Sequence, residues 1–250
     1  MKNKTVKKVI FNLFWIIVWQ LAAMGVNKAL LIPVPTPAGT ALAMLRLFEK
    51  AEFWASAGLS VIRILLGFGA AMIIGTLCGV LSARHEFFGN LMAPVLSFIR
   101  AIPVAALTII LFLWVKRDMI PSVIAFVTVL PIVWGNVESG ILSLNRGLIE
   151  MARVFGMGRG VIFKEITVPG IKPFLVSSFA SGMGFAWKSG CAAEIICRTA
   201  NSLGNLLWSS KSTVDYDEVF AVAFVIIFLS TVFQTLSKRL VKKGAGNDKV

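Results

Sequence analysis

The sequence predicts an all-α polytopic membrane protein. Of its 250 residues, 57% are hydrophobic and only 15% are charged, whereas about a quarter of the residues in soluble proteins are charged. The apolar residues form long runs, and most of the basic residues behind the formal net charge of +13 lie between these runs. Basic loops of this kind are typical of membrane topology, so the charge does not indicate a nucleic-acid partner.

Six stretches have about the length and composition of a transmembrane helix, which needs roughly 20 predominantly apolar residues. They lie near residues 9–27, 59–82, 97–115, 119–138, 174–196 and 217–236. We therefore expect about six spans in a single transmembrane domain over residues 1–250.

The first stretch follows a basic segment, MKNKTVKK, and has the outline of a signal peptide. Its apolar run over residues 9–26 is long for a signal peptide and contains Trp15 and Trp19, and no convincing cleavage site follows. We expect this segment to be retained as the first transmembrane helix and to act as a signal anchor.

Two different segments separate the first and second spans. LIPVPTP at residues 31–37 is expected to be extended, because a proline disfavours helix in the residue before it. Residues 38–57 mix charged and apolar side chains and predict a helix at the membrane interface.

Glycines and prolines mark the second and third spans. Gly67, Gly69, Gly75 and Gly79 in the second span predict a close approach of a neighbouring backbone. Pro94 and Pro103 flank Arg100, so the third helix is expected to begin irregularly.

The distribution of loop charges predicts the orientation. With six spans, both termini share one side with the loop between the fourth and fifth spans, and that side holds most of the lysine and arginine. The positive-inside rule then places both termini and this loop in the cytoplasm.

Ionisable residues within the apolar stretches are functional candidates, because they are costly in a bilayer unless paired or hydrated. Lys188 and Glu194 lie six positions apart in the fifth span, so about 9 Å of rise and 120° of rotation separate them. Together with Arg100 they are candidate pore or gate residues. The alternative is that each only makes a fixed interhelical contact. Catalytic, phosphate-binding and metal motifs are missing from the sequence, which predicts a non-enzymatic protein without a cofactor.

The most distinctive stretch is EMARVFGMGRGVIFKEITVP at residues 150–169. Its pattern predicts a helix over 148–155, a break over 156–160 and a second short helix over 161–167 that ends at Pro169. Met151, Val154, Phe155 and Met157 are the apolar side chains with which the first helix would enter a groove on a partner. An ordinary basic loop would explain the arginines and lysines, but not the spacing of the other residues.

That spacing, Glu150, Ala152, Gly156, Ile166 and Pro169, resembles the EAA motif of ABC-importer permeases. Met151 and Val168 depart from the motif by conservative apolar changes. Further stretches resemble the nitrate, sulfonate, taurine and bicarbonate group of these permeases: LIPVPTP at 31–37, SVIRILLGF at 60–68, RAIPVAAL at 100–107, AWKSGCAAE at 186–194 and NSLGNLL at 201–207.

The resemblance implies a type I ABC importer permease fold, in which a second permease copy completes the pore. It also implies a cytoplasmic ATPase docked on a coupling loop near 145–172 and an extracytoplasmic solute-binding protein. It further implies a location in a bacterial-type plasma (inner) membrane. The predicted docking residues are Glu150, Ala152, Gly156, Ile166 and Pro169 of the motif, together with the apolar anchors Met151 and Phe155.

The substrate that this resemblance implies is a small organic or inorganic anion, and Lys188 and Arg100 are consistent with one. An aromatic vitamin precursor is an alternative. A third possibility is an ion-coupled secondary transporter using Lys188 and Glu194, but the sequence shows none of the repeated halves expected of that class.

Overall fold

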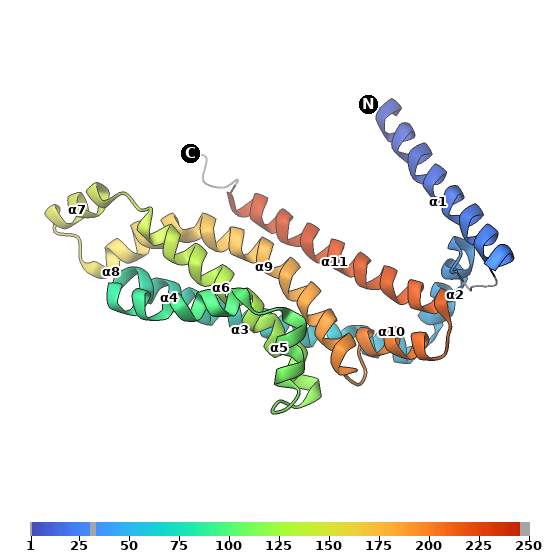
Figure 1. Ribbon diagram of the computed structural model, residues 1–250. Helices are drawn as coiled ribbons and strands as arrows, with labels where there is room; N and C mark the ends of the chain where they lie inside the picture. Colours follow the sequence, from blue (N-terminus) through green and yellow to red (C-terminus); the bar gives the residue numbers. More distant parts are fainter. Residues whose placement is uncertain (1, 31–33, 246–250) are drawn as a thin grey trace.

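A computed structural model describes residues 2–30 and 34–245, and every regular element within those ranges is helical (Figure 1). The predicted all-α fold is therefore confirmed. The helices are α1 (Lys2–Leu30), α2 (Pro37–Glu49), α3 (Ala51–Arg84), α4 (Glu86–Ala101), α5 (Val104–Leu111), η1 (Arg117–Met119), α6 (Ile120–Leu142), α7 (Arg146–Val154), α8 (Arg159–Ile162), η2 (Phe163–Thr167), α9 (Val168–Cys197), α10 (Leu203–Ser212) and α11 (Tyr216–Ala245).

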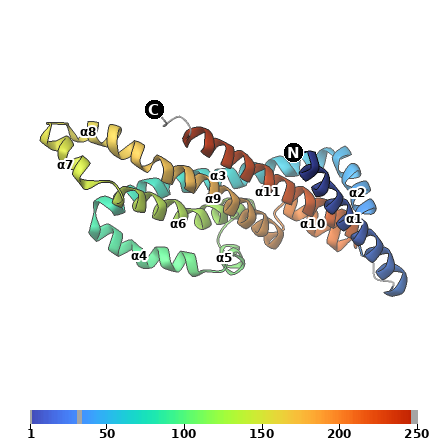
Figure 2. The same ribbon diagram turned by 90° about the horizontal axis from the view of Figure 1, so that it is seen from above.

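The centre of the fold is a row of three long helices, with α6 packed between α3 and α9. α11 lies along α9 (Figure 2), while α2 and α10 lie together at one end of the bundle and α7 and α8 project at the other (Figure 1). The N-terminal end of α1 stands away from the bundle (Figure 1). Trp19 nevertheless packs against the rings of Phe220 and Phe224 of α11.

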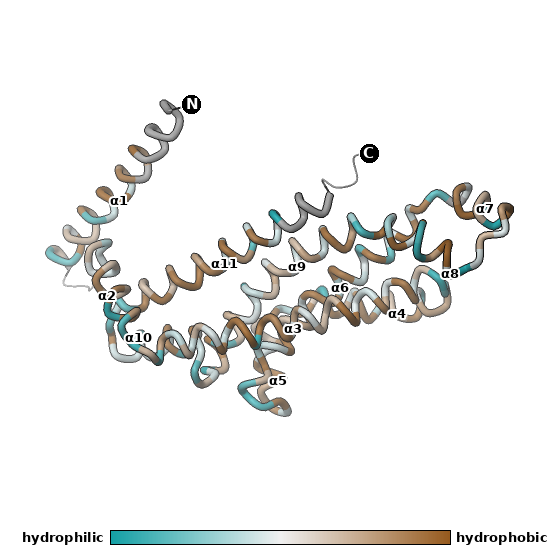
Figure 3. Tube along the Cα trace, turned by 180° about the vertical axis from the view of Figure 1, so that it is seen from behind, coloured by the Kyte–Doolittle hydropathy of each residue, from teal (hydrophilic) through white to brown (hydrophobic). Residues whose placement is uncertain are grey.

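Three helical segments in the described ranges are long and apolar enough to cross a membrane, namely Ala51–Arg84, Arg117–Leu142 and Tyr216–Ser237. The pair of α4 and α5 makes a fourth if it counts as one span. Figure 3 shows hydrophobic residues along most of α3 and α11. Of the other two expected spans, α1 has a shorter apolar stretch, and the serines, glycines and ionisable residues of α9 make its 30 residues less apolar.

The third span differs from its prediction. Instead of one helix over 97–115, the chain forms α4 and α5, which meet at an angle of 98°. The break lies at Ile102, whose φ of −71° and ψ of 124° are extended, as expected for a residue before proline. Pro94 lies inside α4. The irregularity is therefore at Pro103 and separates two helices.

The predicted interfacial helix over 38–57 is also divided. α2 ends at Glu49, Lys50 is extended with a ψ of 120°, and residues 51–57 form the first turns of α3. α2 begins where the Thr36 hydroxyl accepts a hydrogen bond from the Gly39 N–H at 3.0 Å, a typical N-cap. Residues 34–36 of the predicted connector are non-helical, and residues 31–33 lie outside the described part of the chain.

Glycines bring α3 and α6 into close contact. A Cβ atom added at Gly75 would lie 2.9 Å from the Val133 Cβ, and one added at Gly79 would lie 2.8 Å from the Trp134 carbonyl oxygen. Gly67 faces the Ser122 backbone in the same way. Three of the four predicted glycines therefore form a seam that only glycine fits. The fourth, Gly69, has nothing within 4 Å of an added Cβ and lies outside the seam.

Hydrogen bonds between helices complete this packing. Ser122 Oγ donates to the Arg63 carbonyl at 2.7 Å, and Trp134 Nε1 donates to Ser82 Oγ at 2.8 Å, both between α6 and α3. On the other side of α6, Asn136 donates to Ser178 Oγ of α9 at 2.9 Å. Such bonds hold helices together in a bilayer, where apolar contacts with lipid are as favourable as contacts between helices.

The seam can be tested by adding one methyl group. Gly79→Ala forces carbon against the Trp134 carbonyl, and overpacking of this kind costs about 1–3 kcal/mol. We expect a lower midpoint of thermal unfolding in detergent. Gly69→Ala is the matched control, since its methyl group meets no neighbour. Equal midpoints for the two variants would contradict the seam.

Candidate functional site

The helix α7 and the turn after it form a short, well-defined unit. Asn145 caps the N-terminus of α7 by accepting a hydrogen bond from the Gly147 N–H at 2.9 Å. At the other end, the Met157 N–H donates to the Ala152 carbonyl and the Gly156 N–H donates to the Arg153 carbonyl, at 3.0 and 2.9 Å. This pair of bonds is a Schellman motif, and Gly156, with φ of 76°, occupies its left-handed position. Glycine ends α7 here because it adopts positive φ without strain.

One face of α7 packs on the protein and the other is exposed. Ala152 is buried, whereas Glu150 and Met151 are exposed. Val154 and Phe155 are 86% and 78% exposed, and Met157 of the following turn is exposed as well. We call Met151, Val154, Phe155 and Met157 the α7 patch. A group of large apolar side chains in this position is typical of a surface that contacts another molecule.

The second helix of the loop does not end at Pro169, contrary to the prediction. α8, η2 and α9 follow one another without a break from Arg159 to Cys197. Within η2 the Val168 N–H donates to the Phe163 carbonyl, five residues earlier, which is the bonding of a π-helix. Pro169 lies two residues after this π turn, inside the continuous helical segment. Ile166 is half-buried and Pro169 is exposed.

The exposed residues of α9 include a regular line along the helix. Ser177, Ser181, Phe185 and Lys188 are all exposed and recur every three or four residues, so they share one face. We call these four residues the α9 stripe. Half-buried Ala180 and Gly184 lie next to it and leave it open.

The other long helices expose quite different residues. The exposed positions of α3 include Ile62, Leu66, Ile73 and Leu77, which is the composition expected of a helix facing hydrocarbon. On α11, Phe220, Phe224, Ile227 and Phe228 are exposed. The α9 stripe, with two serines and a lysine, is unsuited to lipid, so it faces water or another polypeptide.

Lys188 lies in a shallow cavity of 390 Å³ between α9 and α11. Gln234 of α11 lines the cavity opposite Gly184, and its side-chain amide donates to Ser230 Oγ at 3.3 Å. Ser177 and Ser181 line the same cavity. The site therefore offers an ammonium group, an amide and two hydroxyl groups to a polar solute.

Glu194 has a different environment. It is fully buried, and its Oε2 atom accepts hydrogen bonds from Ser60 Oγ at 2.8 Å and from the Gly204 N–H at 3.3 Å. Ser60 Oγ in turn accepts a bond from the Leu203 N–H at 2.9 Å. This chain of bonds connects α3, the end of α9 and the start of α10. Oε1 has no hydrogen-bond partner among the described residues.

Arg63 of α3 holds the turn between α9 and α10 and was not among the predicted site residues. Its guanidinium donates to the carbonyls of Ala200 and Asn201 at 3.2 and 3.1 Å, and it forms an ion pair with Asp118 at 3.4 Å. Asn201 and Arg198 both have positive φ, so this is a tightly folded turn. The sequence signal that could have indicated this role was an arginine within the apolar run, one helical turn after Ser60.

Arg100 lies apart from both other pore candidates. Its guanidinium donates to the Pro131 carbonyl at 3.1 Å, and Gly135 leaves room for it on α6. Among the described residues, no hydrogen bond or ion pair joins Arg100, Lys188 and Glu194 to one another. Of the three, only Lys188 lies on the α9 stripe.

Comparison with solved structures shows what this fold resembles. An inward-facing structure of the MetNI methionine ABC transporter matches with a TM-score of 0.61 at 17% identity, covering 74% of this chain and 93% of the other. A bacterial alginate ABC transporter in complex with its alginate-bound periplasmic protein matches with a TM-score of 0.61 at 14% identity, over 96% and 94% of the two chains. The fold is thus that of type I ABC importer permeases.

Comparison with known sequences also finds transport permeases as relatives. The putative aliphatic sulfonates transport permease protein SsuC of Escherichia coli (strain K12) is 28% identical, over 90% of this chain and 85% of SsuC. The taurine transport system permease protein TauC of the same organism is 22% identical, over 89% and 83%. The bicarbonate transport system permease protein CmpB of Synechococcus elongatus is 24% identical, over 71% and 64%.

Residues 53–243, most of the chain, match the family described as binding-protein-dependent transport system inner membrane component. The region includes α7, the α9 stripe and the Glu194 hydrogen bonds. This chain therefore belongs to that family and is a multi-pass permease component of an ABC importer.

Proposed function

We propose that the chain forms half of a translocation pore and couples it to a cytoplasmic ATPase through the loop at 150–169. The observation that carries this proposal is the α7 patch. Its apolar side chains project from the end of the bundle on a helix held rigidly by the Asn145 cap and the Gly156 turn. A short helix with a few apolar anchors is suited to a groove on a partner.

The roles of the remaining docking residues follow from their places. Glu150 is exposed on α7 and offers a carboxylate to the ATPase. Ala152, which is buried, lets α7 lie close to the bundle. Gly156 orients α7 against α8. Ile166 and Pro169 belong to the helical segment that leads from the loop into α9.

That segment supports a mechanism of coupling. Because α8, η2 and α9 are continuous, a displacement of the loop is transmitted along the helix to the α9 stripe. ATP binding closes the ATPase dimer and brings two loops together, and the two α9 helices then reorient around the solute. Hydrolysis reverses the movement, and the permease itself contributes no catalytic residue.

The α9 stripe supports a dimeric pore. A polar face on a helix in the bilayer has to be covered by protein or water, and a second copy of the chain provides a matching face. We place the solute between two α9 stripes, near Lys188 and the hydroxyl groups of Ser177 and Ser181. An extracytoplasmic binding protein delivers the solute to the end that carries α2 and α10 (Figure 1).

The proposed orientation follows the loop charges. Both termini and α7 are placed in the cytoplasm. The C-terminal part of α11 runs toward the end of the bundle that carries α7 and α8 (Figure 2), which supports this placement for the C-terminus.

We propose a small anion, such as a sulfonate, taurine or nitrate, as the substrate. The named substrates of SsuC and CmpB are anions, and TauC is named for taurine, which carries a sulfonate. Lys188 supplies a positive charge on the stripe. An aromatic vitamin precursor is the second candidate, because the ring of Phe185 lies exposed one turn from Lys188. Membership of the importer family argues against the ion-coupled secondary transporter.

Docking can be tested by capture of the ATPase encoded beside the permease gene. The double variant Glu150→Lys, Gly156→Asp reverses a charge and removes the left-handed glycine. Loss of a hot-spot contact costs about 2 kcal/mol or more, so we expect the apparent affinity to fall by at least about tenfold. Glu52→Lys, the same charge reversal on the first turn of α3, is the control and should bind normally. Capture of the ATPase by the double variant at the level of the control would refute docking through this loop.

The proposed pore gives Lys188 and Glu194 different roles, so their variants should differ in uptake and stability. In proteoliposomes containing ATPase and binding protein, Lys188→Gln should lower uptake of a sulfonate by about tenfold, since a lost bond to a charged group is worth about 1.5 kcal/mol or more. Its thermal midpoint should stay unchanged, because the side chain is exposed. Lys211→Gln, on α10, is the control for charge.

Glu194→Ala should instead lower the thermal midpoint, because it leaves the donors on Ser60 and Gly204 unsatisfied in a buried site, at a cost of about 1–3 kcal/mol. A normal midpoint for Glu194→Ala combined with lost uptake would transfer the pore role to Glu194. Normal uptake by Lys188→Gln would remove Lys188 from the pore.

A further inference from the structure

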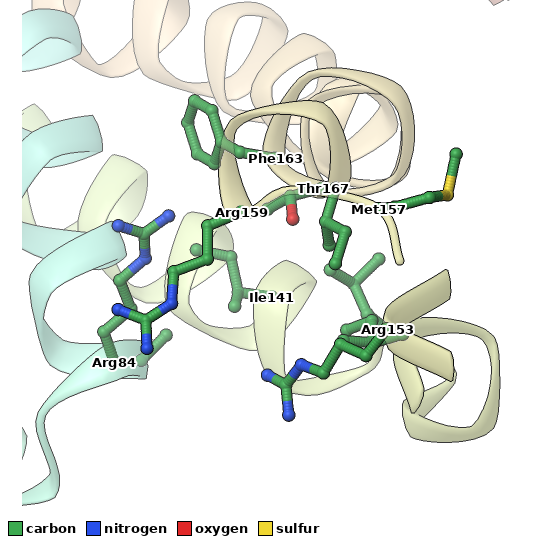
Figure 4. Close-up of a pocket in the computed structure, with 11 residues that line it drawn as sticks. Arg84, Ile141, Arg153, Met157, Arg159, Phe163 and Thr167 are labelled. Carbon is green, nitrogen blue, oxygen red and sulfur yellow. The ribbon is translucent and has the colours of Figure 1, made fainter. Parts of the chain in front are cut away.

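A cavity of 680 Å³ lies between the docking loop and the ends of α3 and α6. Three arginines line it: Arg84 at the end of α3, Arg153 on α7 and Arg159 on α8. Figure 4 shows their side chains extending into one cavity from these separate elements. The cavity therefore collects positive charge from parts of the chain up to 75 positions apart.

None of these three guanidinium groups has a carboxylate partner in the described part of the chain. The ion pairs Lys50–Glu218 and Arg63–Asp118 both lie elsewhere. Arg84 lies over the ring of Phe163 at 5.1 Å, which orients the side chain without neutralising it. Arginine stays protonated in proteins, so three like charges share the cavity. Their repulsion favours a bound anion.

Apart from Thr167, the rest of the lining is apolar. Ile141 at the end of α6, Leu144 just after that helix and Ile162 of α8 form the wall between the arginines. The cavity thus combines a positively charged rim with an apolar wall at the ends of two membrane helices. Guanidinium groups bind phosphate oxygens in a bidentate manner, and basic pockets between the cytoplasmic ends of transmembrane helices bind anionic lipid headgroups.

We propose that this cavity binds the phosphate of an anionic phospholipid, with the glycerol and upper acyl carbons against the apolar wall. The proposal rests on the cytoplasmic placement of the loop proposed above. An acidic segment of the ATPase is less suited, because Arg84 belongs to α3, whereas Met151, Val154 and Phe155 of the α7 patch do not line the cavity. A lipid that contacts Arg84 and Arg159 together ties the loop to α3 and makes coupling sensitive to lipid composition.

The test uses the full-length permease purified in a neutral detergent. Phosphatidylglycerol, phosphatidylcholine and inorganic phosphate are titrated separately, and binding is read from native mass spectrometry and from the thermal midpoint. The variants are Arg84→Gln combined with Arg159→Gln, the single change Arg84→Lys, and Lys164→Gln. Lys164 is an exposed basic residue of the same loop that does not line the cavity, so it controls for charge.

We expect phosphatidylglycerol to bind the wild type and to raise its midpoint, with phosphatidylcholine having no effect. The double variant should bind phosphatidylglycerol about tenfold more weakly, because hydrogen bonds between charged groups are stronger than neutral ones. The affinity of Arg84→Lys should fall between those of the wild type and the double variant, since lysine keeps the charge but cannot bind phosphate in a bidentate manner. Lys164→Gln should bind like the wild type. Saturation by inorganic phosphate alone would make free phosphate the ligand and overturn the lipid assignment.

Two further results would also overturn it. One is equal binding of phosphatidylglycerol by the wild type and the double variant. The other is a loss of ATPase capture by Arg84→Lys without a change in lipid binding, which would make a partner protein the occupant. Because ATPase capture is measured separately from lipid binding, failure of this proposal is distinguishable from failure of the docking proposal.

Discussion

The close approach of α3, α6 and α9 is the constraint on which the other features depend. Burial of apolar area drives helices together in water, but it adds little in lipid, so contact has to come from small residues and hydrogen bonds. Gly75 and Gly79 provide the contact between α3 and α6, and Gly182 receives Val129 of α6, whose Cγ1 would lie 3.0 Å from an added Cβ. With α6 enclosed in this way, α9 is held by α6 on one side and by α11 on another, and the α9 stripe stays exposed.

The α9 helix therefore has two faces with different chemistry. Its buried face carries Glu194, whose hydrogen bonds fix the turn into α10. The exposed face carries Lys188 and two serines. A fixed carboxylate at one end and an exposed ammonium along the same helix are compatible with a helix that moves as a rigid body, since Glu194 and Lys188 do not compete for the same partner.

Much of this architecture could be predicted from the sequence, because long apolar runs and glycine spacing reflect local properties of the chain. Prolines were harder to interpret. Pro94 and Pro169 lie inside continuous helical segments, Pro169 shortly after the π turn at Phe163–Thr167, whereas Pro103 lies between two helices. Glu194 and Lys188 looked alike as charges in an apolar run, and only the contacts with Ser60 and Gly204 distinguish them.

The loop at 150–169 also shows what the sequence predicts and what only the folded structure reveals. The spacing of Glu150 and Gly156 predicted a docking surface, but it did not reveal why glycine is needed there: Gly156 has the positive φ that ends α7. Nor did it connect Arg84 with Arg153 and Arg159, because the cavity exists only once α3 and the loop are folded together. Sequence reasoning assigned the loop arginines to membrane topology alone. In the folded chain these arginines line one cavity, so the residues that indicate membrane topology also form the proposed anion site.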